Sequence, residues 1–321
     1  MTPPIGLVFG SLTPPEGIAS AARRAEEAGF GEFWISEDCF FSGGVAGLAQ
    51  VLGATRRAPV GTGVLSVMSR HPAVTAMEFA GLARAYPGRV RAGVGLGVRA
   101  WLKQMGRLPD APLTAVRETV AVLRRLLAGE EVTVDGHAHR LDRIRLDFPP
   151  PEPPPIHLGA VNEAALRASG RIADGTILSV LAGPAYVRRA RQLIAAPGHR
   201  ITTFVLYAVD DDRDRARAAV RDAVALFLTA EANSALVRVP GHDKELAALL
   251  AEDTEVPLAR RIPEAWLDEF AVAGTPADCA DGLQRLLDAG SDALGLWLFP
   301  TDRADRVAEL TAAEVLPRLA R

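Results

Sequence analysis

Cysteine is scarce in this chain, and no apolar run is long. The two cysteines, Cys39 and Cys279, lie far apart and form no CxxC motif, so no disulfide framework is predicted and a reducing cytosol fits. No apolar segment approaches the roughly 18 residues of a membrane span, and the N-terminal residues lack the basic start and long apolar core of a signal peptide. We therefore expect a cytoplasmic protein that does not enter a membrane.

An excess of charge of one sign is also missing. The 36 basic and 39 acidic residues leave a net charge of −3, so no basic field argues for nucleic acid or an anionic membrane as a partner. With 49% hydrophobic and 23% charged residues, the composition is that of a globular enzyme or binding protein. A chain of 321 residues suggests two domains at about 150 residues each, but an α/β barrel of this size folds as one. We expect a single domain over residues 1–321.

Strand and helix signals alternate from end to end. Short apolar runs closed by glycine or proline predict strands, and segments with Ala, Leu, Glu and Arg at helical spacing follow them. The predicted strands are Ile5–Phe9, Phe33–Ser36, Val60–Leu65, Val90–Val94, Ile156–Leu158, Thr176–Ser179, Ile201–Val209 and Ala293–Leu298. Such alternation implies a parallel sheet, and eight units favour a closed (β/α)8 TIM barrel over an open doubly wound sheet.

Insertions are predicted after the fourth and seventh strands. In the first, Trp101–Ala128 is helical with a break at Pro109–Pro112, and Val132–Leu141 forms a hairpin that turns at Asp135-Gly136. In the second, the stretch from Glu231 to Pro263 interrupts the pattern. Since function in a barrel lies on the loops after the strands, candidate residues are sought there.

Two glycine-containing turns open helices after strands. Gly93–Gly97 has the spacing GxGxG rather than GxGxxG and follows the fourth strand, so it is a weak dinucleotide fingerprint. Close approach of an anion or ligand is favoured over glycines that merely fit a crowded rim. Gly159–Glu163, after the fifth strand, is suited to receive a phosphate, unless Asn162 serves as an ordinary helix cap.

Titratable groups follow the second and third strands. Of the adjacent Glu37 and Asp38, one can hold a ligand hydroxyl or relay a proton, and the alternative is helix capping. Arg70 could meet an anion and His71 could donate to a ligand carbonyl, against the alternative of a solvated rim. The pair His137–His139 lies in the predicted hairpin, far from any strand end, so a catalytic metal is not favoured.

Taken in order, these motifs resemble the bacterial luciferase-like family of flavin- or deazaflavin-dependent oxidoreductases. Within that family the chain resembles the branch of methylenetetrahydromethanopterin reductase and the F420-dependent sugar-phosphate dehydrogenases. The matching segments are Ala25–Phe30, Phe33–Asp38, Gly61–Val64, Arg70–Ala73, Gly88–Val90, Gly93–Gly97, Glu118, Leu123-Arg124, Val132–Leu141, Pro155–Ala160 and Ser169–Gly175.

The resemblance implies a (β/α)8 barrel that transfers a hydride between coenzyme F420 and a small-molecule substrate. FMN is the alternative cofactor, and an FMN-dependent monooxygenase or a non-catalytic flavin-binding barrel are the alternative functions. The Ala- and Arg-rich composition is typical of high-GC organisms, in which F420 is common, and so favours F420. Family members often form homodimers, and the sequence leaves that state open.

The resemblance also assigns positions in the site. It implies a non-proline cis peptide at Gly63-Val64, whose bulge backs the cofactor ring, and a cofactor phosphate near the loops after strands four and five. The cofactor-binding residues that follow are Glu37, Gly63, Val64, Gly95, Leu96, Gly97, Val98, Gly159, Ala160, Val161 and Asn162.

This chain departs from the sugar-phosphate dehydrogenases at three places. It has Asp38 where they use a histidine, Val98 where they use a glutamate, and Val161-Asn162 where they have Gly-Gly. These differences argue against glucose 6-phosphate as the substrate. They leave Asp38 and His71 as the nearest candidates for the catalytic proton donor.

Overall fold

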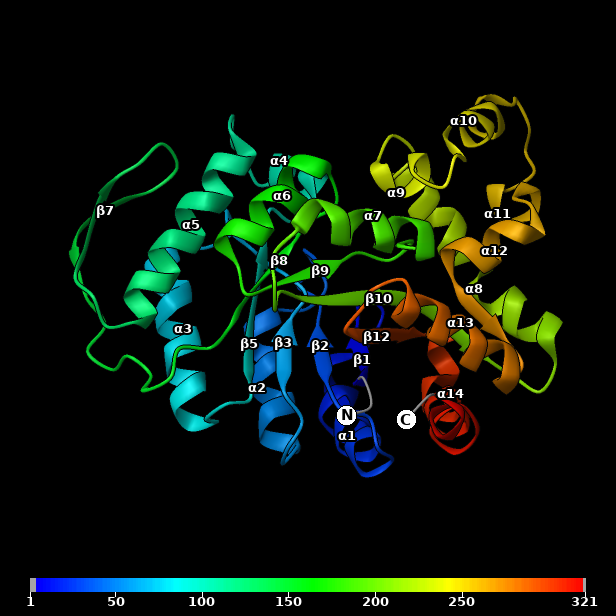
Figure 1. Ribbon diagram of the computed structural model, residues 1–321, viewed down its shortest axis with the longest axis horizontal. Coiled ribbons are helices and arrows are strands. Elements are labelled where there is room, and N and C mark those ends of the chain that lie inside the picture. The colour runs from blue at the N-terminus through cyan, green and yellow to red at the C-terminus, as the bar shows by residue number, and fades with distance from the viewer. Residues whose placement is uncertain (1–3, 320–321) are drawn as a thin grey trace.

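Parallel strands close into a barrel in the computed structural model, which describes residues 4–319 (Figure 1). Ten strands share one sheet; eight of them pair in a ring, β12 closes the ring against β1, and β4 and β11 extend it. The ring strands are β1 (Ile5–Phe9), β2 (Phe33–Ile35), β3 (Val60–Thr62), β5 (Val90–Gly95), β8 (Ile156–Gly159), β9 (Gly175–Leu178), β10 (Arg200–Val209) and β12 (Ala293–Leu298). The predicted (β/α)8 fold is confirmed.

One predicted strand is in fact two. The apolar run Val60–Leu65 leaves the ladder at Gly63, so β3 ends at Thr62, and a short β4 (Leu65–Ser66) resumes the pairing with β5 nearer the carboxyl end of β5. The two residues between them, Gly63 and Val64, belong to neither strand.

Helices between the strands cover the outside of the barrel. Many begin with proline in the first turn, where its missing N–H costs nothing, and Thr275 forms a capping box with Asp278. They are α1 (Pro15–Glu27), α2 (Gly44–Ala54), α3 (Pro72–Ala85), α5 (Pro112–Leu127), α6 (Glu163–Ile172), α7 (Pro184–Ile194), α8 (Arg213–Ala230), α13 (Pro276–Asp288) and α14 (Ala304–Leu310). A 3₁₀ turn at Thr301–Arg303 precedes α14, and a π turn at Thr311–Val315 and a 3₁₀ turn at Leu316–Arg318 follow it.

Large side chains fill the amino-terminal half of the barrel interior. Trp34 packs edge-on against Phe204 and His157, with ring centroids 5.8 and 5.6 Å apart. Beneath it the buried Glu32 accepts hydrogen bonds from Trp34 Nε1 (2.6 Å) and Arg200 Nη2 (2.7 Å). Burial, together with the nearby arginine charges, lowers the pKa of His157 to about 3. Its imidazole is therefore neutral and serves to fill the interior. The interior is therefore plugged at this end, and ligands must reach the other.

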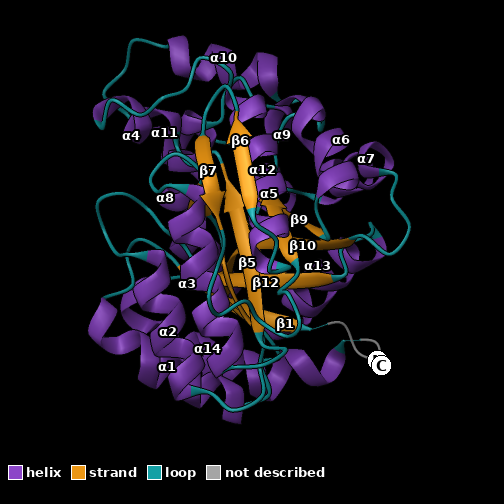
Figure 2. Cartoon of the chain, turned by 90° about the vertical axis from the view of Figure 1, so that its left-hand side faces the viewer, coloured by secondary structure: helices purple, strands orange, loops and turns teal. Residues whose placement is uncertain are grey.

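The first insertion is a short helix and a hairpin. The helix α4 (Arg99–Gln104) precedes α5, and the hairpin of β6 (Val132–Asp135) and β7 (Arg140–Ile144) is confirmed; Figure 2 looks onto it. Glu118 on α5 accepts backbone N–H groups of His137, Ala138 and His139 at 2.8, 2.8 and 3.3 Å. These hydrogen bonds hold the turn that contains His137 and His139 against α5. Residues 4–319 contain no cluster of three or more potential metal ligands.

The second insertion is confirmed and contains short helices. Within the stretch from Glu231 to Pro263, which interrupts the strand–helix alternation, the chain forms α9 (Ala235–Arg238), α10 (Asp243–Ala251) and α11 (Leu258–Arg261), followed by α12 (Glu264–Phe270) and β11 (Val272–Gly274). These helices gather beside α8 at one end of the molecule (Figure 1). They are short, and their apolar residues pack on the core rather than following a long periodic pattern, so the sequence signal is weak. No helix in the described part of the chain is long and apolar enough to cross a membrane.

Candidate active site at the carboxyl ends of the strands

Val64 lies against the carboxyl ends of β5 and β8. A Cβ atom built on Gly95 or Gly159 would fall 2.9 Å from a Val64 methyl carbon, so both positions need glycine for Val64 to occupy this place. The peptide bond between Gly63 and Val64 is cis, at the position that the family resemblance implied; Cys39–Phe40 and Phe299–Pro300 are also cis. A backbone bulge with one apolar side chain therefore faces two glycine-bearing strand ends.

The loop after β5 continues this glycine-rich surface. Gly97 has φ +82°, a conformation that favours glycine, and a Cβ there would fall 2.9 Å from Ser66 Cβ. Ser66 Oγ donates to the Leu96 carbonyl at 2.7 Å and ties this loop to β4. Val98 is exposed and immediately precedes α4.

The loop after β8 leads into α6. Asn162 Oδ1 accepts from the Ala165 backbone N–H at 2.9 Å, so Asn162 is a helix cap, the alternative stated for it above. Ala160 is buried, and the Val161 carbonyl accepts a hydrogen bond from the Tyr186 hydroxyl. In the first turn of α6, Glu163 pairs with Arg189 at 2.6 Å.

Glu37 and Arg70 form a bidentate ion pair that joins the loop after β2 to the loop after β4. The two hydrogen bonds measure 2.7 and 2.5 Å, and Glu37 Oε2 also accepts from the Gly44 N–H at 3.1 Å. The Glu37 side chain is only 7% exposed, and its hydrogen bonds raise the pKa of the Arg70 guanidinium. The anion that Arg70 meets is therefore Glu37, and direct contact of Glu37 with a cofactor stays a prediction.

Asp38 is a half-buried carboxyl held by Ser11. Ser11, in the loop after the neighbouring β1, donates its hydroxyl to Asp38 Oδ2 at 2.7 Å. Burial raises the pKa of Asp38; the bonds from Ser11 lower it in part, and the charge of Glu37 raises it further. Asp38 is thus suited to hold a proton. The sequence analysis missed Ser11, although its place directly after a strand adjacent to β2 was an available signal.

His71 lies beside the hairpin. Its Nδ1 accepts from the Ala73 backbone N–H and caps α3, and its Nε2 lies 3.3 Å from the Arg140 carbonyl oxygen of β7. Its ring centroid is 6.1 Å from that of His139. The contacts described for His71 thus run to its own helix and to the hairpin, whereas Asp38 is bound on the β1 side. A proton-donor role for His71 stays a prediction.

An aromatic group borders the site where β12 and β1 end. The indole of Trp297 is 8% exposed and lies 5.7 and 5.8 Å from the Phe227 and Phe299 rings, and its Nε1 has no hydrogen-bond partner. A Cβ on Gly10 would fall 2.3 Å from this indole, so glycine is required where β1 ends. The sequence analysis missed Trp297, whose signal was an aromatic residue near the end of the last strand.

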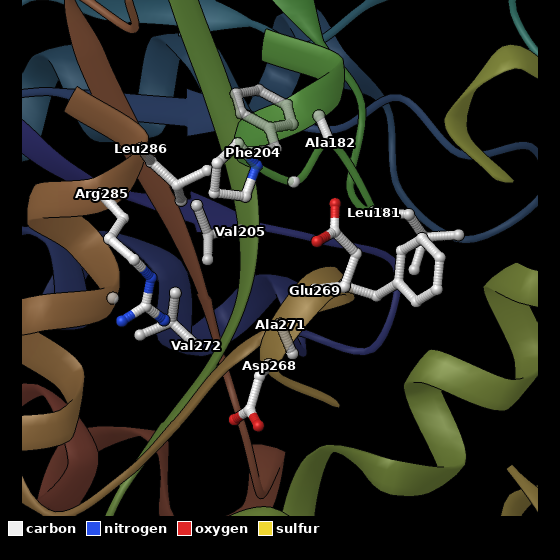
Figure 3. A pocket seen from close by; sticks show the side chains of 14 residues that line it. Leu181, Ala182, Phe204, Val205, Asp268, Glu269, Ala271, Val272, Arg285 and Leu286 are labelled. Carbon is white, nitrogen blue, oxygen red and sulfur yellow. The ribbon is translucent and has the colours of Figure 1, made fainter. Parts of the chain in front are cut away.

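Two hollows lie outside the barrel and do not suit a large planar ligand. The one in Figure 3 has a volume of about 10 Å³, room for roughly one water molecule, and Glu269 points into it. A larger groove of about 690 Å³ lies along α8, α12 and α13. Its wall is built from ion pairs such as Arg217–Asp268 (2.6 Å) and Arg213–Asp278, which already satisfy one another.

The sequence of this chain is similar to known proteins over most of its length. The family model described as luciferase-like monooxygenase matches residues 7–293. An F420-dependent glucose-6-phosphate dehydrogenase of Nakamurella multipartita is 31% identical, with 95% of this chain and 93% of the relative covered. A 5,10-methylenetetrahydromethanopterin reductase of Methanolobus tindarius is 28% identical, with 89% and 91% covered.

Solved structures agree on the fold. The coenzyme F420-dependent tetrahydromethanopterin reductase from Methanopyrus kandleri superposes with a TM-score of 0.83 at 22% identity, covering all of both chains. The oxygenating constituent of 3,6-diketocamphane monooxygenase from Pseudomonas putida, in complex with FMN, gives 0.74 at 18% identity, with 100% and 99% covered.

Proposed function

The chain belongs to the luciferase-like monooxygenase family, and on that premise we propose that it is an oxidoreductase transferring a hydride between coenzyme F420 and a small organic substrate. The observation that carries the proposal is similarity over nearly the whole chain to an F420-dependent dehydrogenase. The reductase from Methanolobus tindarius, covered over 89% of this chain, supports it.

The ends of β5 and β8 fit the proposed cofactor. Val64, packed over Gly95 and Gly159, presents a methyl-bearing side chain at these strand ends, and the exposed Gly97 adjoins it, which suits a flat ring. When bound, the deazaflavin supplies the carbon that gives or accepts the hydride. The residues proposed to hold it are Gly63, Val64, Gly95, Leu96, Gly97, Val98, Gly159, Ala160, Val161 and Asn162, with Glu37 acting from the adjoining loop.

Asp38 is the proposed proton-transferring group. Its raised pKa keeps a proton on the carboxyl at higher pH than an ordinary aspartate would, and Ser11 fixes the orientation of Oδ2. In reduction the protonated carboxyl would give its proton to the substrate, and in oxidation the carboxylate would take one. His71 is retained as a second candidate because it is titratable and lies in the loop after β4.

The deciding experiment compares cofactors on one purified protein. Titration with F420, followed by protein fluorescence, is expected to saturate at lower concentration than titration with FMN. Turnover would then appear as a change of the 420 nm absorbance band. Tighter binding of FMN, with oxygen-dependent oxidation of its reduced form, would contradict F420 and favour a monooxygenase, the function named by the matching family model. Binding without turnover of any substrate would indicate a flavin-binding barrel.

The proposal extends to the cellular setting and the partners of the enzyme. Both cysteines are free thiols, which suits the reducing cytoplasm. We propose a single barrel domain that acts on a small molecule without nucleic acid or membrane partners. Light scattering on the purified protein would separate a monomer from the homodimer left open by the family resemblance.

A further inference from the structure

Three exposed apolar side chains lie next to Asp38. Leu12, Phe40 and Phe41, here called the apolar rim, are 57%, 68% and 59% exposed. Single exposed apolar residues are ordinary on protein surfaces, but these three occupy two adjoining loops at one edge of the barrel. Their grouping therefore needs a physical reason.

The hydrogen bond between Ser11 and Asp38 fixes where the rim lies. The loops follow β1 and β2, which pair in parallel with Phe9 opposite Ile35, and the 2.7 Å bond joins them beyond the strand ends. Leu12 directly follows Ser11, and Phe40 comes two residues after Asp38. The rim thus flanks the carboxyl proposed to transfer the proton.

The loops around this carboxyl lack a free positive charge. The loops after β1 and β2, residues 10–14 and 36–43, contain no lysine or arginine, and Arg70, which reaches them from the loop after β4, is bound by both Glu37 oxygens. The nearby charges that remain are acidic. A phosphate or carboxylate on this side would therefore be desolvated without a counter-charge, which is costly.

Basic groups lie instead toward the β8 side. Arg189 pairs with Glu163 at the start of α6, and the charge of Arg238 on α9 also lowers the pKa of Glu163. The two sides of the strand ends thus differ in charge as well as in polarity.

We propose that the substrate is a neutral compound whose apolar ring or chain packs on Leu12, Phe40 and Phe41, with its reacting oxygen at Asp38. Phosphorylated sugars are excluded by the same surface. This inference rests on the proposed function, because it assigns the β1–β2 side to the substrate and the β5–β8 side to F420. Three side chains are far too small a patch for a stable interface between proteins, which buries about 800 Å² per partner.

The test uses the protein loaded with F420 and two probes, cyclohexanone and glucose 6-phosphate. Saturation-transfer NMR is expected to show contact with cyclohexanone and none with the phosphate. The variant Leu12→Gln/Phe41→Gln should weaken cyclohexanone binding about tenfold and leave F420 affinity unchanged. Phe148→Gln is the matched control, because Phe148 is 71% exposed on the loop between β7 and β8. Like the wild type, this variant should contact cyclohexanone and not glucose 6-phosphate.

Each other outcome overturns the inference in a recognisable way. Stronger contact with glucose 6-phosphate than with cyclohexanone would refute a neutral apolar substrate while leaving F420 dependence intact. Unchanged cyclohexanone binding in the double variant, together with a fall from dimer to monomer in light scattering, would make the rim a contact between copies. Failure of wild-type protein to bind F420 would remove the proposed function, and the inference with it.

Discussion

The two sides of the strand ends are built in different ways. On the β5–β8 side there are glycines at 95, 97 and 159, the start of α6, and the apolar side chains of Val64, Leu96 and Val98. On the β1–β2 side it is made of side chains: Asp38 held by Ser11, the Glu37–Arg70 pair, and the apolar rim. Backbone gives a shape with few chemical options, whereas side chains give charge, proton transfer and selectivity. This contrast is the basis of our proposal that cofactor and substrate bind on different sides.

The largest expected effect separates chemistry from cofactor binding. Asp38→Asn keeps the size of the side chain but cannot transfer a proton, so turnover should fall by about 10²–10⁴-fold. F420 affinity should change less than twofold, since the Asp38 carboxyl is bound to Ser11 and is not among the residues proposed to hold the cofactor. Steady-state rates and F420 titration of the same preparation check both. Equal loss in the two measurements would erase the distinction between the sides.

A change on the β5–β8 side should do the reverse. In Gly159→Val the new Cβ must displace Val64, and we expect F420 affinity to fall about a hundredfold, which corresponds to about 3 kcal/mol. Gly81→Ala is the control, because a Cβ on Gly81 meets no atom within 4 Å. Fluorescence titration measures the affinities and circular dichroism checks the fold. An unchanged affinity with intact fold would place the cofactor elsewhere.

Loss of the Glu37–Arg70 ion pair should mainly lower the free energy of unfolding. Arg70→Met leaves the Glu37 carboxylate almost buried with only the Gly44 N–H beside it, and should cost about 2 kcal/mol, less than a fully buried pair because Arg70 is partly exposed. The double variant Glu37→Gln/Arg70→Met should recover part of that loss in urea unfolding. If Glu37→Gln alone weakens F420 binding more than it lowers stability, the predicted cofactor contact of Glu37 is confirmed.

Ser11→Ala should produce the smallest effect, a shift in pH dependence. Removing the donor hydroxyl raises the pKa of Asp38 further. A reaction that needs the protonated carboxyl loses rate as pH rises through that pKa, so its falling limb should move to higher pH in the variant. Ser11→Thr should restore the wild-type profile. A profile that stays in place would show that Ser11 only packs against the loop.

The sequence was sufficient to predict the barrel, because hydrophobic periodicity and the glycines and prolines that end or begin elements are local signals. Apolar runs closed by glycine, and helices begun with proline, located each ring strand within three residues. The bulge at Gly63-Val64 was expected only from the family resemblance. The local pattern of Val60–Leu65 reads as one strand, because the break depends on Val64 packing on Gly95 and Gly159, far along the chain. The short helices of the second insertion were missed for the same reason.

The candidate site was predicted less completely than the fold. The candidate residues lie at or just after the carboxyl ends of strands, as expected, but the sequence could not say which of these groups already bind one another. Arg70 is taken by Glu37, Asn162 by α6, and His71 by α3 and the hairpin. Ser11 and Trp297 were overlooked because a lone serine and a strand tryptophan carry no motif. Partners of this kind are set by tertiary contacts.

A crystal structure of the protein with F420 would test the assignment of the two sides most directly. The account predicts density for the planar ring against Val64, between the ends of β5 and β8, with Asp38 and the apolar rim across from it. Density in the charged groove along α8 and α13, or a ring lying on Phe40 and Phe41, would contradict it.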